Sequence, residues 1–318
     1  MAVSVGNEIT AAQFNGLQSR VATVMGTGSG TDGYGQSLAS SQVIVTNLVQ
    51  ASDFDNLRTD INKANNHQSG SNASIGDIAP GQIIGADASG TSVGSLTVAD
   101  EGFNDYDSAI TNIENNKFLI DAGNSSVEAG TSSTRTTNWN GTITHVFTVT
   151  FASANERRFF FNSGGEIRFS ANLSGQTGSK SDDWATLLSN MGTIKFNYTE
   201  TTSTGTGTGS AIGDSDLTGT YQTIFTKTGS GVYAENDYNI QARADSTSVL
   251  RFQIEFRDDD LGDQVLPGSN PGIDGIIVPG PAVDEDVNGT LVSTVQQLRA
   301  TGSNVSVTGP SYTNTSNL

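Results

Sequence analysis

Residues 157–198 gather much of the aromatic content of this chain, and that concentration constrains its fold more than any other feature. Aromatic residues make up only 7% of the sequence, so the segment that collects them should nucleate a hydrophobic core. Two short apolar runs, residues 159–161 and 166–173, flank an Asn-Ser-Gly-Gly stretch. This spacing predicts a β-hairpin closed by that stretch. One face of its second strand would carry Ile167, Phe169, Ala171 and Leu173.

The sequence period changes to that of a helix at residues 181–192. Ser181 suits the N-cap, the two aspartates that follow it suit the positive end of the helix dipole, and Gly192 suits the position past the C-terminus. We therefore expect a short helix that lies over the sheet or closes one end of a sandwich, before a strand that starts at Ile194. Its apolar stripe would consist of Trp184, Leu187, Leu188 and Met191.

Alternation of apolar and polar residues marks the C-terminal part of the chain from Gly141 onward. The chain is rich in Gly, Ser, Thr and Asn and only 15% charged, which is typical of extended β-structure with many turns. About eight strands with Gly-rich turns indicate a β-sandwich, for which we expect a jelly-roll topology. The later strand candidates are residues 221–226, 231–244, 249–257, 290–299 and 304–308.

Three related segments in the first 122 residues predict three amphipathic helices. In each segment, apolar residues recur at spacings of three and four, which place them on one helical face. Thr10 and Gln13 also form a capping-box pattern at the start of the first helix. Each helix should be about three to four turns long. The stripe residues are Phe14, Leu17 and Val21; Phe54, Leu57 and Ile61; and Phe103, Tyr106 and Ile110.

One narrow apolar stripe does not stabilise a helix by itself. The three helices must therefore pack against one another, against the β-domain or against a neighbouring subunit. The long Gly/Ser-rich spacers between them favour arms that reach across to partners, so we expect the nine stripe residues to serve in attachment.

These patterns divide the chain into a helical attachment region at residues 1–122, a linker or first irregular strand at 123–140, and a β-sandwich domain at 141–318. The predicted fold class is mainly β. It consists of a C-terminal, jelly-roll-like β-sandwich with one short helix, preceded by an α-helical region of three repeated amphipathic helices.

The chain carries a net charge of −18 and no basic tail or stripe. Nucleic-acid binding relies on Lys and Arg to neutralise phosphates, so no nucleic-acid partner is expected, and an anionic membrane surface is disfavoured for the same reason. No apolar run reaches the ~20 residues of a membrane helix, and the N-terminus lacks the pattern of a signal peptide. The chain has no cysteine, which is compatible with assembly in a reducing cytoplasm. We therefore expect a soluble protein.

The acidic run that begins at Asp258 is the best candidate for chemistry. Hard cations such as Ca²⁺ bind clustered carboxylates and loop carbonyls, and the ligands that this run offers are Asp258, Asp260 and Asp263. The alternatives are a solvated acidic loop at the end of a strand and a pair of catalytic carboxylates of a glycosidase. We expect no cofactor other than this possible structural calcium.

Other motifs match a known chemistry by letter only. A Gly-x-Gly-x-x-Gly string at residues 28–33 follows a helix instead of joining a strand to a helix, and a nucleophile-elbow string at residues 90–94 lacks a clear strand before it. His67 and His145 come without the further ligands of a zinc site. We therefore predict a protein that is not an enzyme.

Trp139 is the tryptophan outside the central segment and is flanked by two asparagines. An exposed ring at this position would suit stacking on a host-surface glycan. Alternatively, Trp139 is in phase with Ile143 and Phe147 if the strand starts early, which favours packing at the domain junction.

Two further stretches join the central segment in a family signal. The central segment reads Phe-Phe-Asn-Ser-Gly-Gly-Glu-Ile-Arg-Phe and then Asp-Trp-x-x-Leu-Leu-x-x-Met-Gly-Thr-Ile, and the others are residues 256–264 and 284–295. Together they resemble the virion structural proteins of marine and cyanobacterial tailed phages of the contractile-tailed, large-genome type. The resemblance covers roughly residues 1–20, 48–70 and 141–310.

The resemblance implies a non-enzymatic structural protein located in the virion and assembled in the host cytoplasm. We expect a tail-associated part, a fibre or baseplate appendage, that forms a homo-oligomer, with a trimer favoured, and that contacts other virion proteins. The first alternative is a capsid decoration protein or head–neck collar protein. The second is a host-glycan-binding module, and the third is an enzyme such as a depolymerase.

Overall fold

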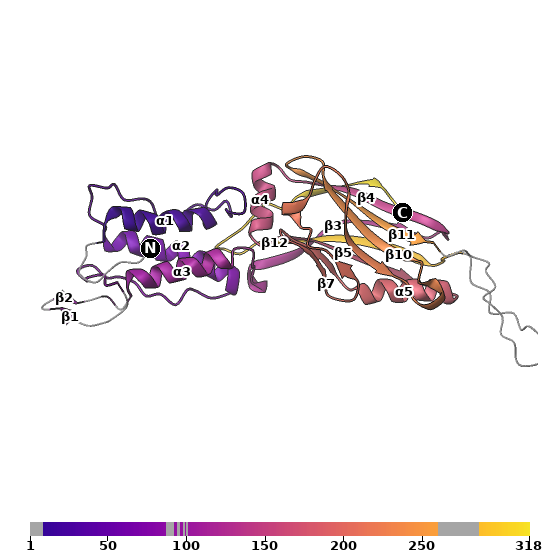
Figure 1. The fold of residues 1–318 in the computed structure, drawn as a ribbon, viewed down its shortest axis with the longest axis horizontal. Coiled ribbons are helices and arrows are strands. Elements are labelled where there is room, and N and C mark those ends of the chain that lie inside the picture. The colour runs from indigo at the N-terminus through magenta and orange to yellow at the C-terminus, as the bar shows by residue number, and fades with distance from the viewer. Residues whose placement is uncertain (1–8, 87–91, 94–95, 98, 100, 260–285) are drawn as a thin grey trace, which may run out of the picture. The chain divides into compact units, whose positions relative to one another are not determined.

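The computed structural model describes residues 9–86, 92–93, 96–97, 99, 101–259 and 286–318. The chain divides into two compact units (Figure 1). Unit 1 combines residues 1–127, 153–165 and 298–309, and unit 2 combines residues 128–152, 166–297 and 310–318. Neither unit is one continuous segment, whereas the boundaries predicted near residues 122 and 141 assumed continuous domains.

Unit 1 is built on the three predicted helices, α1 (Ala11–Met25), α2 (Ala51–Ser69) and α3 (Phe103–Asn115). The predicted capping box of α1 is present, because the amide of Gln13 donates to Thr10 Oγ1 at 3.3 Å and the amide of Thr10 donates to Gln13 Oε1 at 2.9 Å. The amide of Gly102 donates to Asp105 Oδ2 at 2.7 Å at the start of α3. At 19 residues, α2 is longer than its stripe predicted.

The three helices pack on one another through their predicted stripes, and all nine stripe residues are buried. Phe54 is at the centre of this packing. Its ring centroid lies 5.2 Å from that of Phe14 and 5.2 Å from that of Tyr106, both in edge-on geometry. Internal packing, one of the alternatives left open by the sequence, is therefore what holds these helices.

Unit 1 also contains α4 (Ala154–Asn162), the 3-10 helix η1 (Ala122–Asn124) and the strands β1 (Ser92–Val93) and β2 (Leu96–Thr97). α4 overturns the first half of the predicted hairpin. Ser153 is its N-cap and accepts a hydrogen bond at Oγ from the amide of Glu156 at 3.1 Å. A run of three phenylalanines suits a strand or a helix, and this cap favours the helix. Gly164, with φ +83°, then turns the chain toward the next strand.

Unit 2 contains two antiparallel sheets (Figure 1). The six-stranded sheet has the order β13-β4-β11-β10-β9-β8, and the five-stranded sheet has the order β3-β12-β5-β6-β7. The first sheet consists of β4 (Gly141–Thr150), β8 (Thr208–Gly209), β9 (Gln222–Thr228), β10 (Asp237–Ala244), β11 (Val249–Asp258) and β13 (Ser311–Ser316). The second consists of β3 (Ser125–Arg135), β5 (Glu166–Ser174), β6 (Ile194–Phe196), β7 (Thr201–Ser203) and β12 (Thr290–Ala300).

The strongest alternating segments are strands, as predicted. In β4, His145, Phe147 and Val149 are buried, and Thr142 and Thr150 are exposed. Residues 304–308 are not a strand; they contribute only a bridge between Thr301 and Ser306. The expected strand at residues 231–244 begins instead with the 3-10 helix η3 (Gly231–Tyr233), and another 3-10 helix, η2 (Asp214–Asp216), precedes β9. Residues 123–140, expected to be a linker or a first irregular strand, contain the whole of β3.

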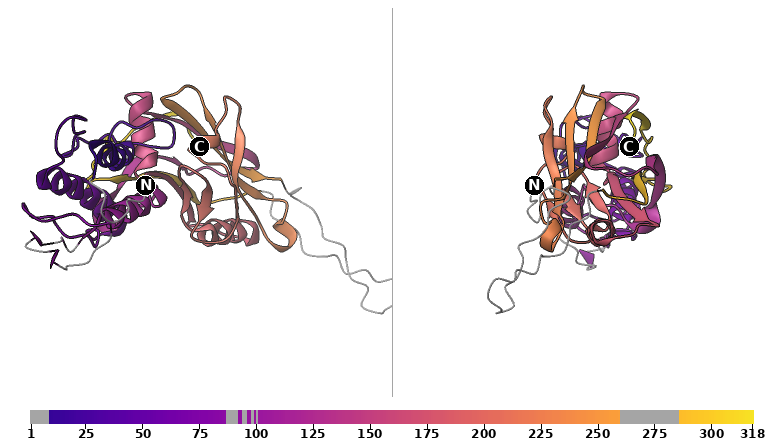
Figure 2. Two further views of the ribbon diagram at one scale, coloured as in Figure 1. Left: turned by 60° about the vertical axis from the view of Figure 1, so that its left-hand side comes forward. Right: turned by 90° about the vertical axis from the view of Figure 1, so that its right-hand side faces the viewer.

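Further views of the ribbon show the strands of unit 2 (Figure 2). Aromatic rings from both of its sheets meet inside the unit. Phe147 of β4 pairs in register with Phe252 of β11, and their rings stack with centroids 5.5 Å apart. From the other sheet, Phe169 of β5 lies 5.2 Å from Phe252 and Phe196 of β6 lies 5.3 Å from it. The segment predicted to nucleate a core therefore supplies two of these four rings.

Helix α5 (Ser179–Met191) packs against β5, and its four predicted stripe residues are buried. It starts two residues before the predicted N-cap. Ser181 does not cap the helix, because it is buried and its Oγ accepts a hydrogen bond from the amide of Asn288 at 3.0 Å. Since α4 and α5 both lie within residues 141–318, the prediction of a single helix there is wrong. When the helices of unit 1 are included, the described residues contain nearly as much helix as strand.

The outermost strands of the two sheets are joined on both sides of unit 2. On one side, β7 and the residues after β8 form a bridge in which Thr201 and Ser210 exchange backbone hydrogen bonds of 2.9 and 3.1 Å. On the other side, Asn314 of β13 accepts a bond of 2.8 Å from Thr131 Oγ1 of β3 and donates one of 3.0 Å to the carbonyl of Ser132. These contacts cover edges that would otherwise be open to pairing with another strand.

Candidate functional site

The nine predicted attachment residues lie inside unit 1 and not on its surface. Each has at most 1% of its surface exposed, so these side chains bind the other helices of the same chain. Because these side chains are buried, they cannot contact a partner directly, as the attachment hypothesis required. Any attachment through unit 1 must therefore use other residues, on the outer faces of the helices or in the loops.

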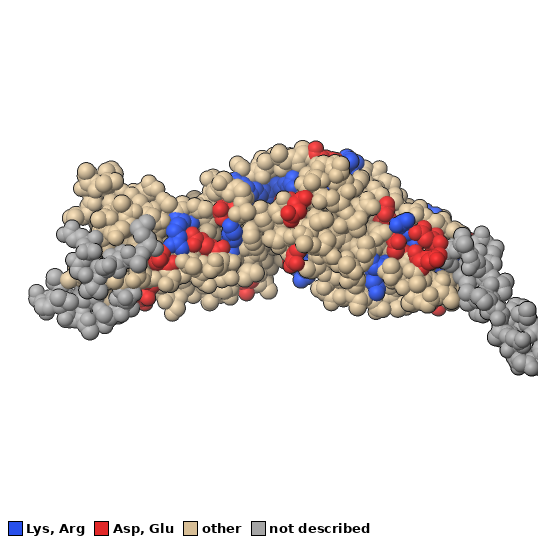
Figure 3. Space-filling model, in the orientation of Figure 1, with Lys and Arg blue, Asp and Glu red and all other residues tan. Residues whose placement is uncertain are grey.

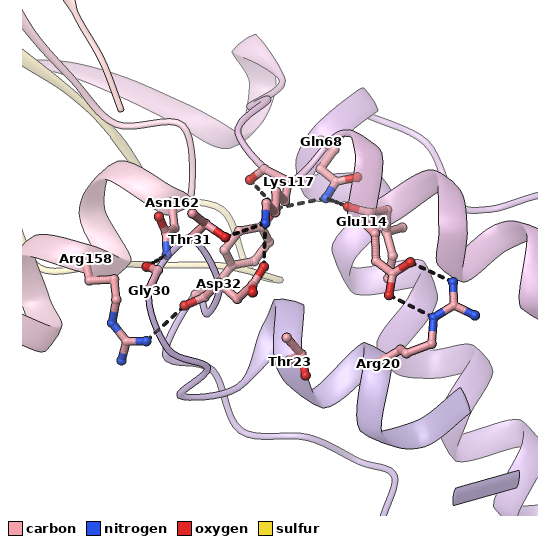
Figure 4. Close-up of polar contacts among 12 residues, drawn as sticks. Arg20, Thr23, Gly30, Thr31, Asp32, Gln68, Glu114, Lys117, Arg158 and Asn162 are labelled. Atoms are coloured by element: carbon pink, nitrogen blue, oxygen red, sulfur yellow. Dashed lines mark hydrogen bonds and ion pairs between the residues drawn. The ribbon is translucent and has the colours of Figure 1, made fainter. Parts of the chain in front are cut away.

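Polar contacts tie the helices of unit 1 together (Figure 4). Arg20 of α1 makes a two-pronged ion pair with Glu114 of α3, with distances of 2.8 Å at Nε and 2.6 Å at Nη2, and also pairs with Asp107. Glu114 is the main cause that raises the pKa of Arg20, so the guanidinium is charged at any working pH. The pair is partly exposed, and its role is to fix how α1 and α3 align.

A second set of contacts surrounds Tyr34, which is buried after the loop that follows α1. Its hydroxyl donates to the carbonyl of Lys117 at 2.6 Å and accepts from Gln68 Nε2 at 2.8 Å. Burial raises the pKa of Tyr34. The ammonium of Lys117 contacts Asp32 at 2.6 Å, and Arg158 of α4 donates to the carbonyl of Asp32 at 3.0 Å. These bonds join α2, the segment that follows α3, and α4 to one loop.

His67 lies in the last turn of α2, and it is completely buried. Its Nε2 is 3.0 Å from the carbonyl oxygen of Ser163, and its ring packs edge-on against Tyr34 at 5.2 Å. Burial lowers the pKa of His67 to about 4. A neutral imidazole that donates to a backbone carbonyl is a structural contact between α2 and the end of α4.

The Gly-x-Gly-x-x-Gly string at residues 28–33 has a steric explanation. All three glycines have positive φ, at +47°, +59° and +102°. A Cβ on Gly28 would lie 2.5 Å from the carbonyl of Asp32, and one on Gly33 would lie 2.5 Å from the carbonyl of Thr27. The string is thus a tight turn after α1 that brings Tyr34 into the core. The nucleophile-elbow string overlaps β1, and residues 90, 91 and 94 lie outside the described residues.

Asp258, the first predicted calcium ligand, is an internal ion-pair partner. It is the last residue of β11, and its Oδ2 lies 3.2 Å from Nζ of Lys180, with both side chains 0% exposed. Lys180 belongs to the first turn of α5, so the pair joins this helix to the sheet. Sequence reasoning did not single out Lys180, because one sequence does not couple residues that are 78 positions apart.

The other two predicted ligands, Asp260 and Asp263, lie outside the described residues. Asp259, which is described, pairs with Arg257 at 3.3 Å. Within the described part of the chain, no group of three or more His, Asp or Glu side chains is arranged to hold a metal ion. The calcium hypothesis therefore stays a prediction without geometry, and one of its three ligands is engaged by a lysine.

Trp139 is buried, with 3% of its surface exposed. Its backbone forms a bridge with Val287, and its ring packs edge-on against that of Trp184 with centroids 6.0 Å apart. A sugar cannot stack on a ring that other side chains cover, so Trp139 is not the glycan contact that the exposed alternative required. Trp139 is instead packed against other side chains, which is the alternative that its strand phase favoured.

His145 belongs to a buried polar group inside unit 2. Its Nδ1 lies 3.0 Å from Ser293 Oγ of β12, and its Nε2 lies 3.0 Å from Asn314 Oδ1 of β13. Burial lowers the pKa of His145. The imidazole thus connects strands of both sheets, and each ring nitrogen is occupied by a polar partner.

Charged residues on the surface pair with one another. On the face drawn in Figure 3, acidic and basic residues lie side by side in small groups, and most of the surface carries neither. Beside the six-stranded sheet, Asp245 forms an ion pair with Arg243 at 2.8 Å and accepts a hydrogen bond from Arg251 at 2.7 Å. The guanidinium of Arg243 also lies over the ring of Tyr221. No sequence pattern points to this group, because its members come from three separate segments.

Comparisons with known proteins add no relative. No protein-family model matches this chain, no curated protein matches it, and no solved structure matches it. Among the described residues, none of the helices has the length and apolar character that crossing a membrane requires.

Proposed function

We propose that this chain is a non-enzymatic structural protein of a phage virion, located in the tail as a fibre or baseplate appendage. Unit 1 provides attachment, and unit 2 serves in assembly or host contact. The resemblance of the central segment and of two later stretches to virion proteins of tailed phages motivates the word virion. Residue chemistry supports the absence of an enzymatic role.

One observation supports the proposal that the protein is not an enzyme. The described carboxylate and imidazole groups that the sequence singled out as candidates for chemistry are engaged by other residues of the same chain. Asp258 pairs with Lys180, and His67 contacts Ser163. His145 contacts both Ser293 and Asn314. A general base or nucleophile needs access to a substrate. Side chains that are fully buried and joined to neighbouring strands or helices stabilise a rigid body instead.

The two sheets of unit 2 fit a jelly-roll-like β-sandwich, and we include this topology in the proposal. Strands β9, β10 and β11 are consecutive neighbours, and β4, which precedes them by a long connection, pairs with β11. That order is a Greek key, the unit from which jelly rolls are built. A rigid β-domain with covered edges is well suited to repeated use in a particle, since open edges invite uncontrolled pairing.

We also propose that the protein works as a homo-oligomer, with a trimer favoured, among other virion proteins. Closed symmetric assembly from identical chains is the usual arrangement of soluble oligomers. The net charge of −18 disfavours binding to the phosphates of a nucleic acid, and on the face drawn in Figure 3 basic side chains lie next to acidic ones. The partners expected from this chemistry are therefore proteins.

Immunogold labelling of intact virions tests the location, with antibody raised against unit 2. We expect gold at the tail end of the particle. Gold over the head or neck would contradict the tail assignment and would favour the capsid-decoration or collar alternative. Virions treated with pre-immune serum are the control for non-specific labelling.

A further inference from the structure

The three most exposed large apolar side chains of the described residues stand together on one loop of unit 1. The loop joins α1 to α2 (indigo in Figure 1), and it exposes 68% of Ile44, 77% of Val45 and 87% of Leu48. Single exposed aliphatic residues are ordinary on a protein surface. Three within five positions form a patch of the kind that marks an interaction site.

Hydrogen bonds hold this loop in place on the helices. Asn15 of α1 pairs with the backbone of Val43 in both directions, donating at 2.8 Å and accepting at 2.7 Å. Asp60 of α2, whose side chain is buried, accepts from the amides of Ala39 and Ser40 at 2.9 and 2.8 Å. The amide of Asn47 donates to the carbonyl of Ile44 at 2.8 Å and closes a turn.

The patch is therefore displayed on a fixed turn, which we define as the apolar turn, residues 43–48. A loop that is only tolerated at the surface does not need a buried carboxylate and a paired asparagine to hold it. Ordering before contact lowers the entropy cost of association. The geometry thus favours a protein contact that uses this turn repeatedly.

The distribution of charge along the chain favours one kind of partner for the apolar turn. The chain has a net charge of −18, yet residues 33–52 contain no charged residue. A cationic partner would be attracted to the acidic surface elsewhere, and an uncharged stretch would add nothing to its recognition. Two copies of this acidic chain repel one another, and they can approach most easily where neither carries charge.

We propose that the apolar turn is a self-association surface that contacts the same turn of a second copy of this chain. This inference rests on the homo-oligomer of the proposed function and names the surface that forms it. Identical turns that meet around a rotation axis make a closed contact, and the same geometry serves a dimer or a trimer. At that axis, the side chains of Ile44, Val45 and Leu48 leave water and pack against the same side chains of the other copy.

The absence of cysteine from the chain allows a direct test by cross-linking. Leu48→Cys is placed in the full-length protein and oxidised gently with a glutathione redox buffer. We expect disulfide-linked dimers on a non-reducing gel, formed on the order of tenfold faster than by chance encounter because the turns are held together. The matched control is Leu119→Cys, at another exposed leucine of unit 1 with 54% exposure.

A charge substitution provides the second arm. Leu48→Asp places like charges at the axis, and we expect sedimentation velocity to show a shift from the oligomer to the monomer, while Leu119→Asp leaves the oligomer intact. The circular dichroism spectra of both variants should match that of the wild type, because both side chains are exposed in the single chain. A variant that unfolds would be recognised by circular dichroism, and the cysteine arm then decides.

The outcomes separate this inference from the function on which it rests. Suppose that the wild type and Leu48→Asp both oligomerise, and that Leu48→Cys cross-links no faster than the control. That result would refute the apolar turn as the self-association surface, while the homo-oligomer itself would still be supported. A wild-type chain that stays monomeric at every concentration would overturn self-association itself. Labelling of virions is independent of both results.

Discussion

At the residue scale, the pair between Lys180 and Asp258 is the most consequential polar contact in unit 2. Both side chains are 0% exposed, and their charged atoms lie 3.2 Å apart. Removing charges from water is costly, and mutual attraction compensates only when both partners are present. The ends of this pair come from α5 and β11, so the contact also specifies where the helix sits on the sheet.

Lys180→Met should therefore destabilise the protein by about 3–5 kcal/mol, because it removes the ammonium from a buried carboxylate. Chemical denaturation of the full chain measures the change. Asp55→Asn, which breaks an exposed pair with Arg58, is the control and should cost no more than about 1 kcal/mol. Equal effects of the two substitutions would contradict the assignment of Lys180 and Asp258 as a buried pair.

His67 makes the stability of the protein depend on pH. Its folded-state pKa of about 4 lies below the ordinary value of 6.5, so the unfolded chain binds a proton that the folded chain does not. Its contribution is fully present above pH 6.5 and is lost progressively as pH falls toward 4, by about 3 kcal/mol in all. The lowered pKa of His145 acts in the same direction.

His67→Gln tests this dependence, because the glutamine amide can still donate to the carbonyl of Ser163 but does not titrate. Denaturation curves at pH 7 and pH 5 compare the variant with the wild type. We expect the wild type to lose more stability than the variant between these two values. Equal losses would show that the imidazole of His67 does not titrate as a buried group.

At the element scale, close approach between α4 and the loop after α1 depends on one glycine. Gly35 has φ +72°, and a Cβ placed on it would lie 2.5 Å from the ring of Phe159. The ring occupies the space that any other side chain would need. A residue with a Cβ at this position would force the Phe159 ring to shift and would also be strained at this φ.

Gly35→Ala should destabilise unit 1 by roughly 1–3 kcal/mol more than Gly30→Ala. Both positions have positive φ, so both variants share the backbone strain, but a Cβ on Gly30 meets nothing within 4 Å. The difference between their thermal unfolding midpoints isolates the steric clash with Phe159. Similar midpoints would mean that α4 does not pack on this loop.

The elements that could be predicted from the sequence are those with an unambiguous period. The stripe from Phe14 to Val21 and the alternation of β4 each allow only one regular structure, and both are present. Residues 159–161 are three consecutive phenylalanines, which fit a strand or a helix. The deciding signal was upstream, where Ser153 and Glu156 have the spacing of a capping box.

The site residues were harder to predict than the elements for a related reason. The acidic run containing Asp258 has the composition of a cation site, and only the fold reveals that Lys180 approaches its first member. The burial of Trp139 by Trp184 likewise depends on a contact between distant segments. Composition therefore identified which residues were unusual, while tertiary contacts determined what they do.

At the scale of the whole molecule, the chain builds two units from interleaved segments. Residues 153–165 and 298–309 return to unit 1 after the chain has entered unit 2. No composition shift marks these returns, which explains why continuous domains were predicted. Their effect is to involve distant parts of the chain in both units.

We propose that this protein is a component of a phage particle. Quantitative mass spectrometry of virions purified on a density gradient tests it most directly, with the major capsid protein as the internal standard. We predict that the chain co-purifies with infectious particles at a fixed number of copies per particle through successive gradients. A chain found in the infected-cell lysate but lost from the particle band would contradict the account.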